Sequence, residues 1–132
     1  MATFIQGFQP QLYALMRIMV GFLVLWHGTE KLFSFPVPPK QVAPFMLYIA
    51  GSIDLIGGVL VMVGLLAGWA ALILGGLKAL TYWMFHGTLA LLPMQNGGEL
   101  SALYCFVFLY IAAQGSGIWS VEAALDKTPP SP

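Results

Sequence analysis

The chain has 132 residues, of which 59% are hydrophobic and 8% are charged, with a mean hydropathy of +0.85 and a net charge of +0. A soluble domain carries roughly 25% charged residues, so this composition predicts a membrane protein, with length for about four spans and no separate soluble domain. No basic run suggests nucleic-acid binding, and the single cysteine excludes a disulfide framework or a dithiol pair within one chain.

The predicted fold is all-α: a polytopic bundle of four transmembrane helices, forming one domain over residues 1–132. The spans are expected at about 11–35, 44–66, 69–91 and 99–113. Prolines at 36–39 end the first span, Ala67-Gly68 turns the chain between the second and third, and residues 96–98 break it before the fourth. The first apolar run is too long for a signal peptide, and we expect a retained span. Residues 123–132 are expected to form a flexible tail.

An even number of spans places both termini on one side of the membrane. Lys31 and Lys40 lie on the loop side, and Arg17 and Lys127 lie on the terminal side, so the Lys/Arg count is a tie. We place both termini in the cytoplasm as a prediction.

Five of the twelve ionisable side chains lie inside predicted spans: Arg17, His27, Asp54, Lys78 and His86. Such groups are costly in a bilayer unless they are paired, face the bundle interior or serve a function. Counted from the Ala67-Gly68 turn, Asp54 and Lys78 lie roughly 20 and 15 Å deep, both near the midplane. They are predicted to pair, and the small residues Ala50, Gly51, Gly57 and Gly58 favour an inward Asp54. Arg17, Asp54, Lys78 and Tyr82 form the predicted intramembrane polar network, with either a register-fixing or a proton-path role.

A second polar cluster is predicted near the loop-side surface. His27, Glu30, Lys31, His86 and Glu99 all fall at that depth, and a stripe of Lys78, Tyr82 and His86 would connect them to the midplane. These groups either satisfy one another at a wet interface or bind a ligand. The candidate ligand residues are His27, Lys31, His86 and Glu99, because imidazole, ammonium and carboxylate groups suit a quinone headgroup or a small anion. The helical spacings of His27 to Glu30 and of His27 to Lys31 are weak metal signals without further His or Cys, so we expect no metal.

Several segments in this order resemble the DoxX family of small four-helix membrane proteins: Arg17, His27-Gly28-Thr29-Glu30-Lys31-Leu32, Asp54-Leu55-Ile56-Gly57-Gly58, His86, Asn96-Gly97-Gly98-Glu99 and Gly115-Ser116-Gly117-Ile118-Trp119-Ser120. The resemblance covers about residues 10 to 122. It departs from the usual pattern at Asp54, where Glu is commoner, at Lys78, where an apolar residue is usual, and at Glu122, where Asp is usual.

The resemblance implies a multi-pass protein of a bacterial inner membrane, associated with respiratory or thiol–sulfur redox chemistry. The expected function is therefore a quinone-linked oxidoreductase-associated subunit. Catalysis by the chain alone is doubtful, since no flavin fingerprint, haem pair or cysteine cluster supplies an electron carrier. We expect no intrinsic cofactor, quinone as the ligand, and a partner membrane complex or homo-oligomer besides the lipid bilayer. A non-catalytic accessory or assembly subunit and a small-solute or ion pathway formed by an oligomer remain the alternatives.

Overall fold

The computed structural model describes residues 3–126, and its regular structure is entirely helical. The elements in chain order are α1 (Thr3–Gln6), α2 (Gln9–Phe33), α3 (Pro44–Val63), α4 (Ala67–Thr81), the π-helix η1 (Tyr82–His86), α5 (Pro93–Asn96), α6 (Glu99–Gln114) and α7 (Val121–Leu125). Within the described range there is no strand, so the all-α class is confirmed.

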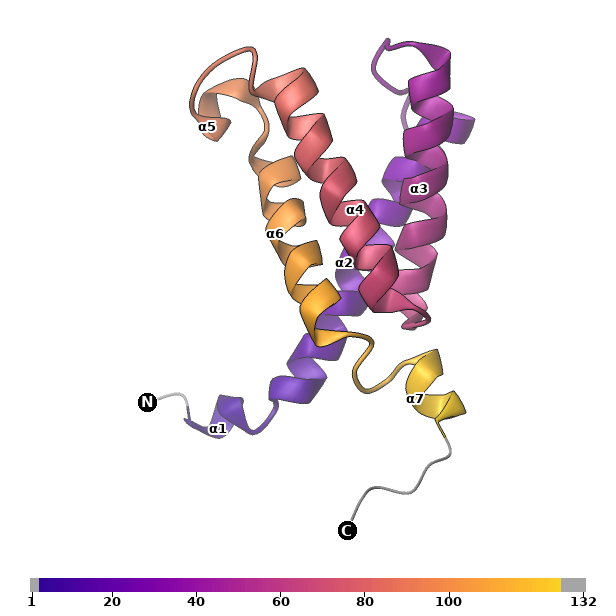
Figure 1. The fold of residues 1–132 in the computed structure, drawn as a ribbon, viewed down its shortest axis with the longest axis vertical. Coiled ribbons are helices and arrows are strands. Elements are labelled where there is room, and N and C mark those ends of the chain that lie inside the picture. Colours follow the sequence, from indigo (N-terminus) through magenta and orange to yellow (C-terminus); the bar gives the residue numbers. More distant parts are fainter. Residues whose placement is uncertain (1–2, 127–132) are drawn as a thin grey trace.

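The long helices form two pairs that meet at one end and diverge at the other (Figure 1). Helix α2 packs along α3, α4 packs along α6, and the short turn at 64–66 joins the two pairs. The diverging end carries the loop 34–43 and α5, whereas α1 and α7 lie at the closed end (Figure 1). The buried apolar core fills the space between the four helices: Val24, Val61, Ala70, Ala71, Leu74, Tyr104, Phe108 and Ile111.

Glycines set the close packing of α2 on α3. A Cβ atom added to Gly28 would lie 2.5 Å from the backbone nitrogen of Leu55, and one added to Gly21 would lie 2.7 Å from the carbonyl oxygen of Gly58. Real Cβ atoms do not approach backbone so closely, so these positions admit only glycine without a shift of the helices. The small residues predicted to mark the inward face of α3 therefore lie at helix contacts.

Two helices, α2 and α3, are long and apolar enough to cross a membrane, and α6 is a shorter apolar helix. In the most apolar 18 residues of α2 and α3, only 33% and 28% of residues are buried inside the molecule. A core helix of a soluble protein would be mostly covered by protein, whereas these helices leave most of their apolar surface for another apolar environment. This pattern agrees with helices that contact lipid.

Three element boundaries differ from the sequence prediction. The turn expected at Ala67-Gly68 lies at 64–66 instead, so α4 already begins at Ala67. The third predicted span, 69–91, is helical only as far as His86, because α4 passes into a π-helical turn that ends there. Residues 121–125 form α7, so the first part of the predicted flexible tail is helical, and the Ser120 side chain caps it by accepting a hydrogen bond from the backbone N–H of Ala123. The remaining predicted tail, 127–132, lies outside the described residues.

Arg17 is fully buried and joins the closed end of the bundle. Its Nη1 donates to the carbonyl oxygens of Val61 (2.8 Å) and Met62 (2.9 Å), and its Nη2 donates to those of Ile118 (3.3 Å) and Trp119 (2.8 Å). The first two carbonyls belong to the last turn of α3, where a cation is favoured by the helix dipole and by unpaired acceptors. Arg17 thus connects α3 to the segment that follows α6.

Candidate functional site

A carboxylate shared by two lysines lies at the centre of the diverging half of the bundle. Asp54 of α3 is fully buried, and its Oδ2 lies 2.6 Å from Lys31 Nζ of α2 while its Oδ1 lies 3.0 Å from Lys78 Nζ of α4. The Lys78 side chain is 7% exposed and that of Lys31 is 23% exposed. Three helices therefore contribute one charge each to this cluster, which we call the Lys-Asp-Lys triad.

A pocket of about 420 Å³ opens beside the triad, where the two helix pairs diverge. Lys31 and Lys78 line it, and Asp54 lies behind them. The N-terminal half of α3 and the end of α4 with η1 contribute mainly apolar side chains to the pocket, including Phe45, Ile49, Leu80 and Met84, which are also exposed on the outer surface. The pocket thus has a polar side next to the lysines and an apolar side that continues onto the outer face of the bundle.

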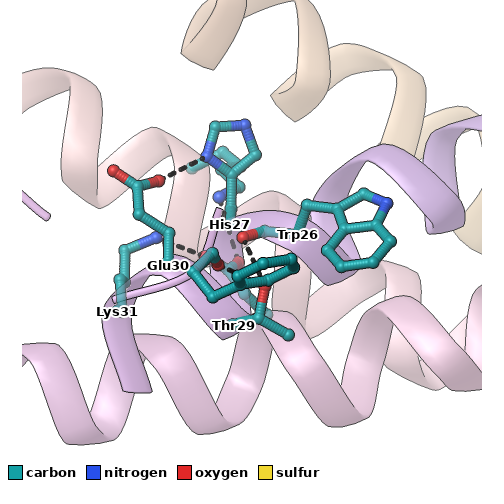
Figure 2. Close-up of polar contacts among 8 residues, drawn as sticks. Trp26, His27, Thr29, Glu30 and Lys31 are labelled. Carbon is teal, nitrogen blue, oxygen red and sulfur yellow. Dashed lines mark hydrogen bonds and ion pairs between the residues drawn. The ribbon is translucent and has the colours of Figure 1, made fainter. Parts of the chain in front are cut away.

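His27 lies on the polar side and is oriented by two neighbours. Its Nδ1 lies 3.5 Å from Glu30 Oε2, an ion pair when the imidazole is protonated, and its ring meets Tyr104 of α6 edge-on at 6.1 Å between centroids. Figure 2 shows His27 and Glu30 facing each other one turn apart on α2. Thr29, beside them, donates to the carbonyl oxygen of Phe35 and so fixes the start of the loop over the pocket.

His86 lines the same pocket from η1 and is held by α5. Its Nδ1 lies 3.1 Å from the carbonyl oxygen of Asn96. A carbonyl oxygen only accepts, so Nδ1 is the donor in this contact. The Asn96 amide in turn donates to the Tyr82 hydroxyl (3.1 Å) and to the carbonyl of Ala90 (3.2 Å), while its Oδ1 accepts from the Gly98 N–H (2.8 Å). This buried asparagine holds the connection between η1 and α6.

The structure brings three of the four predicted ligand residues together and leaves the fourth outside the pocket. His27, Lys31 and His86 line one pocket, but Glu99 is exposed at the start of α6 and is not among the residues that line it. The predicted pairing of Asp54 with Lys78 is confirmed, since their side chains form an ion pair. The assignment of these residues to a function remains a prediction.

Two members of the predicted intramembrane polar network, Arg17 and Tyr82, lie apart from the Asp54–Lys78 pair in the structure. Arg17 lies 14 residues before Lys31 on α2, about 21 Å along the helix axis, and donates its four hydrogen bonds described above to backbone carbonyls. Tyr82 bonds to Asn96 rather than to the Asp54–Lys78 pair, because the π-helical turn belongs to the η1–α5 connection.

Sequence analysis did not predict the ion pair between Lys31 and Asp54. Depth counting assumed that α2 and α3 end at the same level, but the Cβ of Lys31 lies against Gly51. Helix α3 therefore begins about five residues, or about 8 Å, beyond the end of α2. The ten-residue loop 34–43 makes this offset possible. Tyr104 was not among the predicted site residues, and its contacts with His27 and Lys78 place it in the pocket.

No group of three His, Cys, Asp or Glu side chains arranged to hold a metal ion occurs in residues 3–126.

The fold and the pocket together define a small helical membrane protein in which the buried Lys-Asp-Lys triad lies beside a pocket in the diverging half of the bundle. The DoxX family model matches residues 12–87, more than half of the chain. The chain is also 34% identical over 126 residues to an uncharacterized protein of Haemophilus influenzae, covering 89% of this chain and 93% of that protein. The chain therefore belongs to the DoxX family, as its motifs indicated. No solved structure matches it significantly.

Proposed function

We propose that the pocket beside the Lys-Asp-Lys triad binds the headgroup of a lipid-soluble quinone, and that the chain serves as the quinone-binding subunit of a redox complex in a bacterial inner membrane. The observation that carries this proposal is the division of the pocket into a side with hydrogen-bond donors and an apolar side that continues onto the outer face. A volume of about 420 Å³ lies within the usual range for small-molecule sites.

The donor set fits a carbonyl-bearing ring. Each lysine ammonium has three N–H groups. Lys31 donates one to Asp54 and Lys78 forms an ion pair with it, so both lysines keep donors for oxygen atoms in the pocket. His27 and His86 add imidazole nitrogens that can donate or accept hydrogen bonds. A bound quinone would accept two electrons and two protons to give the hydroquinone, and these residues would orient its oxygens and exchange the protons.

The electrons must come from elsewhere in this proposal, because the motifs of the sequence include no flavin, haem or iron–sulfur site. A partner membrane protein, or a further subunit, would supply the redox centre. Outward small residues such as Gly76, which has open space where a Cβ would stand, would permit close approach of another helix.

We further propose four membrane spans, formed by α2, α3, the continuous α4–η1 segment and α6. The α4–η1 segment covers residues 67–86, about 30 Å of helix, which is the thickness of the hydrocarbon core. Helix α6 is shorter, at about 24 Å for Glu99–Gln114. With four spans, α1 and α7 lie at the same membrane side, which we assign to the cytoplasm, and the pocket opens toward the opposite side.

Quinone binding can be tested on purified protein in lipid nanodiscs, with quenching of tryptophan fluorescence by 2-methyl-1,4-naphthoquinone as the readout. Ala50 lines the pocket, so Ala50→Phe should fill it and weaken binding by at least about tenfold. Ile56 is 61% exposed on α3, and Ile56→Phe adds a ring outside this pocket as the matched control. Absence of saturable binding, or equal loss in both variants, would refute the quinone site and favour an accessory subunit.

Dependence on a partner has a separate test. The isolated protein should show no visible cofactor absorbance and negligible quinone reduction with thiosulfate or thiols as donors. Mass spectrometry after mild-detergent purification from native membranes should identify a co-purifying redox protein. Robust turnover by the isolated chain would replace this proposal with a self-sufficient enzyme.

A further inference from the structure

The charges around the pocket are not balanced. Three lysines line it, Lys31, Lys40 and Lys78, whereas the carboxylates are Glu30 on its wall and Asp54 behind it. Leaving the histidines aside, these groups sum to one excess positive charge. An unbalanced charge within an apolar bundle is costly, and an anion in the pocket would remove the imbalance.

The imbalance is concentrated at the triad. Glu30 is directed toward His27, at 3.5 Å from its Nδ1, so the two ammonium groups of Lys31 and Lys78 have Asp54 as their common ion-pair partner among the described residues. Asp54 is fully buried and its two oxygens are each occupied by one lysine. The remaining N–H groups of both lysines belong to side chains that line the pocket, where a single negative oxygen can approach both.

The remaining titratable groups do not offset this charge. Tyr104 of α6 lies under Lys78, with Nζ 6.0 Å from the ring centroid, and favours a cation there. His86 of η1 has its Nδ1 proton directed to the Asn96 carbonyl. Glu99 at the start of α6 is exposed and does not line the pocket.

We propose that this pocket selects apolar ring compounds that carry one negative charge, with the anionic oxygen held between Lys31 and Lys78. This inference deepens the proposed function and rests on it in taking the pocket as the headgroup site. The favoured ligand class is a hydroxylated quinone in its ionised form, in preference to a neutral quinone of the same ring size.

Three probes separate the two proposals in nanodiscs at pH 7. The first is 2-hydroxy-1,4-naphthoquinone, which is ionised at this pH; the second is neutral 2-methyl-1,4-naphthoquinone; the third is naphthalene-2-carboxylate, an anion that is not a quinone. We expect the hydroxylated quinone to bind about tenfold more tightly than the neutral quinone, since the charge lies within a few ångströms of two ammonium groups.

Lys31→Gln is the decisive variant, because Lys78 still neutralises Asp54 and the fold keeps its buried ion pair. In this variant the affinity for the ionised quinone should fall about tenfold more than the affinity for the neutral quinone, so that the preference for the anion is lost. Lys40→Gln removes the same formal charge from the exposed loop at the pocket rim and is the matched control. It should keep most of the preference. A thermal melt of each variant verifies the fold.

Each outcome bears on one proposal or both. Equal binding of the two quinones, or a preference that survives Lys31→Gln, overturns anion selection and leaves the quinone site standing. Binding of naphthalene-2-carboxylate without either quinone supports anion selection and refutes the quinone function. No binding of any probe refutes both.

Discussion

Replacing Asp54 by asparagine removes the carboxylate that two ammonium groups share, and the loss of stability should exceed that of either lysine replacement. In Asp54→Asn, Lys31 is 23% exposed and can move its amine toward the pocket, whereas Lys78 is 7% exposed and is left as a buried, uncompensated charge. Loss of one partner from a buried ion pair costs about 3–5 kcal/mol. In Lys31→Met or Lys78→Met, one lysine still neutralises Asp54, so the cost should be about 1–3 kcal/mol.

The double variant Asp54→Asn/Lys78→Met provides the decisive comparison. It removes the stranded ammonium together with its partner, so it should recover about 1–3 kcal/mol relative to the sum of the single losses. Unfolding in mixed micelles with increasing denaturing detergent, followed by circular dichroism, measures these differences, and Asp54→Glu serves as the charge-conserving control. Strictly additive losses would mean that the triad contributes no coupled stabilisation, and the electrostatic reasoning would be refuted.

Two further predictions concern the scaffold. Arg17→Met removes four hydrogen bonds to backbone carbonyls, so it should lower stability by about 2–4 kcal/mol and make residues 115–126 sensitive to limited proteolysis, and protection equal to wild type would contradict the proposed connection. Gly28→Ala should destabilise by about 1–3 kcal/mol because its Cβ would meet the Leu55 backbone. The matched Gly76→Ala change, with nothing within 4 Å, should be neutral or stabilising by up to about 1 kcal/mol in the same melt.

The helices and the ion pair that were predicted correctly depend on residue type and on helix geometry over short stretches of the chain. Apolar run length predicts α2 and α3, and the prolines after residue 35 end α2 because they lack an amide donor. The Asp54–Lys78 pair follows from the distance of each residue to a short turn, expected at Ala67-Gly68 and found at 64–66, since so short a connection leaves α3 and α4 little freedom to slide. These inferences need only helix geometry and residue type.

The partners of the other polar residues depend on contacts between distant segments. The loop 34–43 allows many offsets between α2 and α3, and packing of Gly21 and Gly28 against the α3 backbone selects the one that brings Lys31 to Asp54. Asn96 reads as a turn residue in the sequence, yet in the structure its buried side chain holds η1 and fixes the proton position of His86. Spacing along a helix gives a residue's face and depth, but only the packed helices determine which side chains meet, because one turn of sliding replaces every partner across the interface.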